Sequence, residues 1–190
     1  MEISLRNDPN FANDPSLNRF KPRSVPAQLK SQSRDLMGDL ESQGVIRRMK
    51  PNEHSKFCAP AGFVPKKSRK LHFVINFTAL NKYVNRPVHA FPSSDDIARS
   101  LKSDTTHIAC IDFPSGYFQA LLSKDSHGYT AFNYEFGCFL FLRAPQGLSS
   151  SGDHFNATTD QFFSGLGDWL LKQVDNMYVL ATSLENLGWT

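Results

Sequence analysis

The sequence predicts an α+β domain whose strands are linked largely by hairpins. Of its 190 residues, 40% are hydrophobic and 21% charged, a composition typical of a folded globular chain. Short apolar or alternating segments are separated by Pro, Asn and Lys, which is the pattern of strands and turns. Three other segments carry apolar residues at helical spacing. Strands that follow one another closely, mixed with helices, indicate antiparallel pairing within an α+β sheet domain.

The N-terminal half predicts one helix and three strands. Residues 1–25 are rich in Asn, Asp, Pro and Ser and lack periodicity, so we expect an extended lead-in. A helix should begin at Pro26 and end at Gly44. Its apolar stripe consists of Leu29, Leu36 and Leu40. The three strands are expected within 44–49, 61–66 and 71–77.

A second helix and a strand follow in the middle of the chain. The helix should begin at Pro92-Ser93, with acidic residues in its first turn and with Ile97 and Leu101 facing inward. The strand covers 107–113, has the apolar character of a buried strand and leads to a carboxylate, Asp112.

The C-terminal part predicts two hairpins around a helix. Antiparallel strands are expected at 129–133 and 136–142. Ser149–Ser151 can cap a helix that carries Phe155, Phe162 and Phe163 at helical spacing. The last two strands, at 170–174 and 177–181, flank Asp175-Asn176, a dipeptide suited to a two-residue turn.

The net charge of +3 hides an asymmetry along the chain. Between Arg19 and Arg86 there are 15 Lys and Arg against four Asp and Glu, a balance of +11. The rest of the chain has six against 14, a balance of −8. A basic segment of this kind is typical of a nucleic-acid surface, although runs of charge are also found on ordinary solvated faces.

Cysteine usage and targeting signals suggest an intracellular protein. Cys58, Cys110 and Cys138 lack metal-ligand spacing, and the last two lie in apolar runs, so we expect buried free thiols in a reducing compartment. The N-terminus has no apolar core of signal-peptide length, and no apolar run approaches the roughly 20 residues that span a bilayer. We therefore expect a cytoplasmic or nuclear protein that is not secreted and has no membrane partner.

Two carboxylates are candidates for chemistry because each ends an apolar strand. Asp112 and Asp175 are 63 residues apart, so they meet only if their strands are neighbours in one sheet. A solvent-open pair of carboxylates can hold Mg²⁺ at a phosphate, and two such ions can activate a 3′-hydroxyl and stabilise departing pyrophosphate. Asp is also common in ordinary turns. Spacing alone leaves both interpretations open.

Ordered motifs distinguish between these interpretations. In chain order they are LESQGVI (40–46), FVPKK (63–67), ALNK (79–82), IDFPSGYFQ (111–119), TAF (130–132), APQGL (144–148) and VDN (174–176). Together they resemble the reverse transcriptase of gypsy-like LTR retrotransposon Pol polyproteins, over 19–186. The resemblance implies right-hand polymerase fingers at 26–92 and a palm at 93–190, with part of the fingers inserted around 119–145. The palm would be an antiparallel sheet backed by helices, and the chain would stop before the thumb.

The resemblance also implies the roles of individual residues. Asp112 and Asp175 would be the metal ligands for two Mg²⁺ or Mn²⁺ ions, and Asn176 would complete the catalytic hairpin. Tyr117 would lie under the sugar of the incoming dNTP, and Gln146 would touch the nucleotide or the template. The expected contacts to the triphosphate are Lys66, Lys67 and His72. The expected contacts to the template–primer backbone are Arg47, Arg48, Lys50, Arg69 and Lys70, whose Lys and Arg pair well with phosphate.

Two departures from the family pattern affect the chemistry. Asn176 stands where the family has a second Asp, which removes a negative charge beside the metals. His72 stands where the family has an Arg, and neutral His is a poorer phosphate clamp than guanidinium. The resulting hypothesis is a truncated, degenerate RNA-directed DNA polymerase domain with impaired turnover. The alternatives are a non-catalytic remnant that binds RNA or DNA, and a structural fragment without function.

Overall fold

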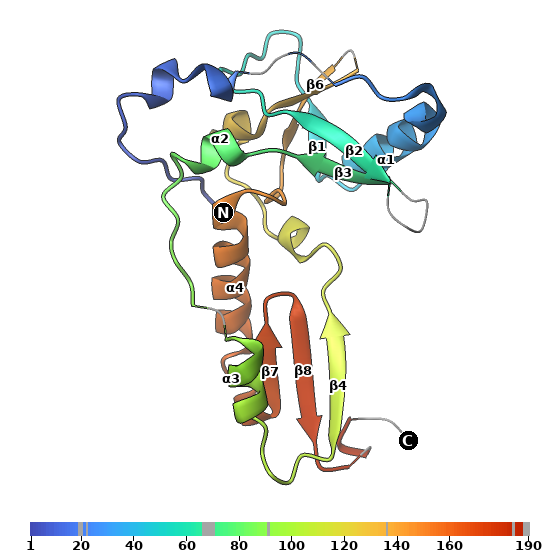
Figure 1. Ribbon diagram of the computed structural model, residues 1–190, viewed down its shortest axis with the longest axis vertical. Coiled ribbons are helices and arrows are strands. Elements are labelled where there is room, and N and C mark those ends of the chain that lie inside the picture. The colour runs from blue at the N-terminus through green and yellow to red at the C-terminus, as the bar shows by residue number, and fades with distance from the viewer. Residues whose placement is uncertain are drawn as a thin grey trace. The chain divides into compact units, whose positions relative to one another are not determined.

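The computed structural model describes residues 1–18, 21, 23–65, 71–90, 92–135, 137–183 and 185–187 (Figure 1). Its helices are α1 (Lys30–Ser42), α2 (Thr78–Asn81), α3 (Ser94–Arg99) and α4 (Ser149–Phe163). Its strands are β1 (Ile46–Arg48), β2 (Ala61–Pro65), β3 (Leu71–Ile75), β4 (His107–Asp112), β5 (Phe132–Tyr134), β6 (Gly137–Phe141), β7 (Leu170–Gln173) and β8 (Asn176–Ala181). All pairs between these strands are antiparallel, so the predicted α+β class with antiparallel sheets is confirmed. No helix in the described ranges has the length and apolarity to cross a membrane.

The chain divides into two compact units. Unit 1 comprises Met1–Arg86 and Tyr117–Ser151, and unit 2 comprises Pro87–Gly116 and Gly152–Thr190. The described strands of unit 1 form a sheet of order β1-β6-β5 and the hairpin β2-β3, whereas those of unit 2 form a sheet of order β4-β8-β7. Each unit therefore builds its own three-stranded sheet by adding a strand that is distant in sequence to a hairpin: β1 joins β5-β6, and β4 joins β7-β8.

Unit 1 is organised around a cluster of phenylalanines. Phe132 and Phe141 are almost fully buried, and their ring centroids are 5.5 Å apart. Phe73 of β3 contacts Phe132 at 5.1 Å, which joins the hairpin to the three-stranded sheet. Buried aromatic pairs at such distances contribute more than their area alone. Many of the phenylalanines in the sequence thus pack together in this core.

The N-terminal segment is part of this same core. Ile3 and Leu17 are only 4% and 5% exposed. The backbone N–H of Ser123 donates to the carbonyl of Met1 at 2.7 Å, so the start of the chain is bonded to a distant loop. No periodicity in the sequence marks these contacts, because the segment is held by isolated side chains and backbone bonds rather than by a regular element.

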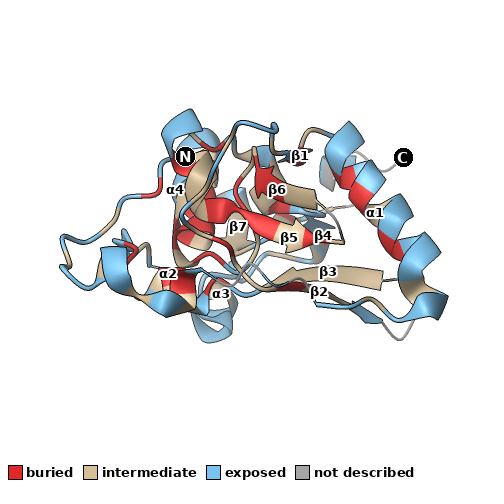
Figure 2. Ribbon diagram, turned by 90° about the horizontal axis from the view of Figure 1, so that it is seen from above, coloured by how far each residue is buried: buried red, intermediate tan, exposed pale blue. Residues whose placement is uncertain are grey.

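Helix α1 is amphipathic, as predicted, but its stripe differs from the one expected. Figure 2 shows buried positions along one side of α1, and these are Ser33, Met37 and Leu40. Leu36 is only half-buried. The helix begins at Lys30 after a 3-10 turn, and it ends before Gly44, whose φ of +64° suits glycine. The predictions that Leu40 is buried and that the helix ends near Gly44 are therefore confirmed, whereas Leu36 lies at the edge of the buried face.

Unit 2 has a sheet with one face covered by α4. Lys172 of β7 donates to the carbonyl of Asn156 in α4 at 2.9 Å, and Phe155 and Met177 are buried. The predicted start of α3 is confirmed, because Ser93 and Asp96 form a reciprocal capping box. The inward position expected for Leu101 is wrong: it follows the end of α3 and is 38% exposed. Phe162, which the helical spacing grouped with Phe155, is 80% exposed.

Strand β4 is an edge strand and is far less buried than its sequence suggests. Ile108 and Ile111 are 50% and 46% exposed, and Cys110 is exposed. The described residues pair β4 with β8 alone, so the side chains of β4 have a neighbouring strand on one side only. The prediction of three buried thiols thus holds for Cys58, is wrong for Cys110 and overstates Cys138, which is intermediate.

Candidate functional site

The end of the unit 2 sheet brings together the three residues proposed for catalysis. Strands β4 and β8 pair from His107↔Ala181 to Asp112↔Asn176, so Asp112 lies directly opposite Asn176. The backbone N–H of Phe113 donates to the carbonyl of Asp175 at 2.9 Å. Asp112 and Asp175 are exposed, and Asn176 is half-buried. The neighbouring strands that the sequence argument required are therefore present, with both carboxylates open to solvent.

The turn that carries Asp175 is displaced by one residue from the prediction. Gln173 pairs with Asn176, so the two turn residues are Val174 and Asp175, and Asn176 is the first residue of β8. Val174 has φ of +57°, a left-handed conformation that is rare for a β-branched residue. The expected Asp175-Asn176 turn is thus wrong, and the consequence is that Asn176 takes a ladder position facing Asp112.

The amide of Asn176 contacts both of its neighbours. Its Nδ2 donates to Asp175 Oδ1 at 3.5 Å, and its Oδ1 accepts from the thiol of Cys110 at 3.9 Å. An Asp at this position could accept hydrogen bonds but could not donate one to Asp175. Asn176 therefore occupies a lone pair of the neighbouring carboxylate as well as lacking a charge of its own.

The carboxylates fit only one kind of metal site. Within the described ranges, no group of three or more His, Cys, Asp or Glu side chains could hold a metal ion. Asp112 and Asp175 are hard oxygen donors, and a Mg²⁺ ion commonly uses one or two protein carboxylates, with waters and substrate phosphates completing its shell. The residues thus fit a magnesium ion shared with a phosphate substrate, and do not fit a closed structural site.

A cavity in unit 1 brings together two of the residues expected to contact the nucleotide. His72 and Gln146 both line a space of about 190 Å³, together with Phe118. His72 is held in the hairpin by its pairing with Val64. The cavity therefore offers one imidazole and one carboxamide beside an aromatic ring, and these groups can bind a polar ligand that has an apolar part.

Other expected contacts lie elsewhere or outside the described residues. Tyr117 is half-buried in the 3-10 helix Gly116–Gln119. Gly116 is required there, because a Cβ would lie 2.7 Å from the ring of Phe155. Residues 66–70, which include Lys66, Lys67, Arg69 and Lys70, are outside the described ranges.

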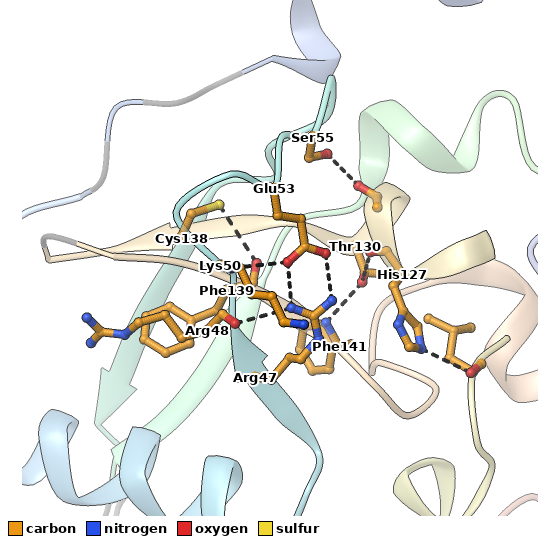
Figure 3. Close-up of polar contacts among 12 residues, drawn as sticks. Arg47, Arg48, Lys50, Glu53, Ser55, His127, Thr130, Cys138, Phe139 and Phe141 are labelled. Carbon is orange, nitrogen blue, oxygen red and sulfur yellow. Dashed lines mark hydrogen bonds and ion pairs between the residues drawn. The ribbon is translucent and has the colours of Figure 1, made fainter. Parts of the chain in front are cut away.

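The cations that directly follow α1 are Arg47, Arg48 and Lys50, and they are only partly available for a ligand (Figure 3). Arg47 donates two hydrogen bonds to the carboxylate of Glu53, both at 2.6 Å. Arg48 lies over the ring of Phe139 at 5.2 Å but is exposed, as is Lys50. The sequence argument treated these cations alike and missed Glu53. The signal was that Glu53 is one of only four acidic residues in the basic segment.

Low pH should reduce the stability of unit 1, because it protonates Glu53 and so removes the ion pair with Arg47. The hydrogen bonds from Arg47 lower the pKa of Glu53 from its usual 4.5 to about 2. The stabilisation is therefore complete above pH 4.5 and is lost as the pH falls toward 2. It should amount to about 1 kcal/mol, because solvent screens a pair whose side chains are about one-third exposed.

Thermal unfolding of the Glu53→Gln variant between pH 2 and pH 7 measures this contribution. The variant should be less stable than the unmodified chain at pH 7 and equal to it near pH 2. Glu135→Gln is the control, since the contact of Glu135 with Arg34 is longer, at 3.4 Å. A constant difference between E53Q and the unmodified chain across this range would contradict the assignment.

The sequence of this chain is similar to viral and retrotransposon polyproteins. No protein-family model matches the chain. It is 28% identical over 183 residues to the enzymatic polyprotein of Cestrum yellow leaf curling virus, covering 88% of this chain and 27% of that protein. It is 28% identical over 130 residues to the Transposon Tf2-3 polyprotein of Schizosaccharomyces pombe, covering 68% of this chain and 9% of that protein.

Among solved structures, the foamy viral protease-reverse transcriptase in complex with an RNA/DNA hybrid matches with a TM-score of 0.77. The identity is 22%, and the match covers 97% of this chain and 24% of that one. The chain thus spans about a quarter or less of each of these proteins. Its relatives are viral and retrotransposon polyproteins, and its fold is that of part of a protease-reverse transcriptase chain.

Proposed function

We propose that this chain is part of the reverse transcriptase domain of a gypsy-like LTR retrotransposon Pol polyprotein. Unit 2 corresponds to the palm and unit 1 to the fingers. The reaction is nucleotidyl transfer from a dNTP to a primer 3′-hydroxyl on an RNA or DNA template. The observation that carries the proposal is the pairing of β4 with β8, which brings Asp112 to the same end of the sheet as Asp175.

The chemistry follows from these two carboxylates. Asp112 and Asp175 would hold two Mg²⁺ or Mn²⁺ ions, which in such sites activate the attacking hydroxyl and stabilise the leaving group. The strained backbone at Val174 supports this role, because strain of this kind is concentrated at functional sites. Both carboxylates are exposed, as is required of ligands that share a magnesium shell with substrate phosphates.

The cavity of unit 1 would bind the incoming nucleotide. Gln146 would hydrogen-bond the nucleotide, Tyr117 would lie under its sugar, and His72, Lys66 and Lys67 would contact the triphosphate. Template–primer backbone would be held by cations of the basic segment. Arg48 and Lys50 are exposed and suit that role, whereas Arg47 must first leave Glu53. Arg69 and Lys70 would extend the same surface.

Turnover by this chain is proposed to be impaired. Asn176 places a neutral donor opposite Asp112, and this arrangement neither adds charge nor leaves Asp175 free. His72 offers one imidazole where a guanidinium would present a planar fork of donors, so it grips phosphate less well than an arginine would. The presence of Asn176 and His72 at these positions also favours a second candidate function, a domain that binds RNA or DNA without catalysis.

Primer extension and template binding by the 190-residue chain test these proposals. On poly(rA) with an oligo(dT) primer and Mg²⁺ or Mn²⁺, we expect slow synthesis that Asp112→Asn abolishes. Binding should weaken about 40-fold between 50 and 200 mM salt if three phosphates are contacted. Binding with this salt dependence but without synthesis supports the second candidate.

Two results would contradict the proposals. Fast DNA synthesis by the unmodified chain would contradict the proposed impairment of turnover. Affinity for template–primer that does not change with salt, combined with no synthesis, would argue against both the polymerase and the nucleic-acid-binding function.

A further inference from the structure

One side chain in unit 1 ties together two motifs that are far apart in the sequence. The Nδ2 of Asn81 donates to the carbonyl of Gly147 at 2.9 Å, and its Oδ1 accepts from the N–H of Ser149 at 2.9 Å. These backbone groups lie on either side of Leu148, at the start of α4. A single carboxamide therefore uses both its donor and its acceptor to hold one loop.

Asn81 can hold this loop because it is itself well anchored. It is the last residue of α2, and its N–H donates to the carbonyl of Phe77 at 2.8 Å. Phe77 and Leu80 are 2% and 4% exposed and fix α2 in the core of unit 1. The position of the carboxamide is thus set by buried packing on one side and by the loop on the other.

The loop that Asn81 holds carries Gln146. The residue after Gln146 is Gly147, with φ of +88°, and a Cβ there would lie 3.3 Å from the carbonyl oxygen of Ile75. Before Gln146, Pro145 is almost fully buried. The backbone is therefore fixed by packing on the N-terminal side of Gln146 and by Asn81 on its C-terminal side, and between them Gln146 lines the cavity with His72.

We propose that Asn81 is a positioning residue for the nucleotide site. It acts through the backbone of the loop, which directs Gln146 into the cavity, and so it sets the affinity of that cavity for a deoxynucleoside triphosphate. This inference rests on the proposed function. It assigns a role to Asn81, which is not among the residues that line the cavity.

Asn81 satisfies both bonds because its carboxamide has a donor and an acceptor. Asp cannot donate to the Gly147 carbonyl and would place a negative charge against that oxygen. Loss of a hydrogen bond that leaves a polar backbone group unpaired corresponds to about tenfold in an equilibrium constant. Asn81→Asp is therefore a nearly isosteric change that releases one end of the loop.

The experiment measures two properties of the full 190-residue chain. Affinity is measured with a fluorescent deoxythymidine triphosphate in Mg²⁺, and loop order by hydrogen exchange of residues 144–151. We expect N81D to weaken binding about tenfold and to accelerate exchange in this segment. Asn85→Asp is the matched control, because the Nδ2 of Asn85 donates to the carbonyl of Leu5 at 3.1 Å, away from the loop.

A double-mutant cycle with Gln146→Ala tests the route of the effect. If Asn81 acts through Gln146, adding N81D to Q146A should change affinity less than twofold. The inference is overturned if N81D alone leaves nucleotide affinity unchanged, or if the two losses multiply in the double variant. It is also overturned if N85D and N81D weaken binding equally.

The outcome also separates this inference from the proposed function. If the unmodified chain binds no triphosphate, the proposed function fails at this cavity, and hydrogen exchange alone then decides the role of Asn81. Faster exchange in N81D supports its control of the loop, and unchanged exchange overturns it.

Discussion

Replacing Asn176 with Asp should raise the rate of primer extension by this chain about 100-fold. The substitution removes the N–H that occupies Asp175 Oδ1 and adds a third carboxylate opposite Asp112. An additional negative charge in this position should strengthen the binding of Mn²⁺ about tenfold. The reason is that a nearby charge contributes about 1–2 kcal/mol to the free energy of binding even in a solvated site. Synthesis assays and a Mn²⁺ titration followed by NMR line broadening measure the two effects separately.

A matched control keeps the added charge but moves it away from the site. Asn186 donates to Thr182 at 3.0 Å beyond the far end of β8, so Asn186→Asp should change neither synthesis nor Mn²⁺ binding. Asp112→Asn in the N176D background should abolish both gains. If N176D and N186D behave alike, or if N176D combined with His72→Arg still shows no synthesis, the proposed catalytic site is wrong.

Replacing Phe132 with Ala should destabilise unit 1 by about 3–5 kcal/mol. Phe132 has no exposed surface, and its ring contacts those of Phe73, Phe139 and Phe141 at 5.1, 5.8 and 5.5 Å. Truncation leaves a cavity at the junction of the hairpin with the three-stranded sheet. Since domains are stable by only about 5–15 kcal/mol, the midpoint of thermal unfolding should fall by about 10 °C.

Phe162→Ala supplies the comparison, because Phe162 is 80% exposed. Removing that ring should change the midpoint by little, as surface substitutions usually do. Equal effects of F132A and F162A on thermal unfolding would mean that the phenylalanine cluster is not the main core of unit 1.

The predictable part of the fold consists of features that neighbouring residues encode. The capping box of Ser93 and Asp96, the end of α1 near Gly44 and the pairing of 132–134 with 137–139 depend on residues a few positions apart. Helical and strand periodicity are local in the same sense. The α+β class and most of the elements could therefore be predicted, with errors at their ends.

The candidate site could be predicted only as a set of residue types. The motifs indicated Asp112 and Asp175, but the ladder shows that it is Asn176, not Asp175, that faces Asp112. A shift of one residue in a turn changes every cross-strand neighbour, and turn position depends on strand register rather than on the turn dipeptide alone. The same limit applies to Arg47: the charge count shows that an acidic residue lies nearby in the sequence, but only the folded structure shows that Arg47 binds it.

By itself, then, the sequence determined the class of fold, the order of its elements and the carboxylates that end the strands. Only the tertiary structure decided that the isoleucines of β4 are exposed, that Asn176 faces Asp112, and that Asn81 holds the loop of Gln146. The reason is physical. Local preferences act between residues within a few positions, whereas burial, register and side-chain partners are set by segments more than 60 positions apart that meet only when the chain folds.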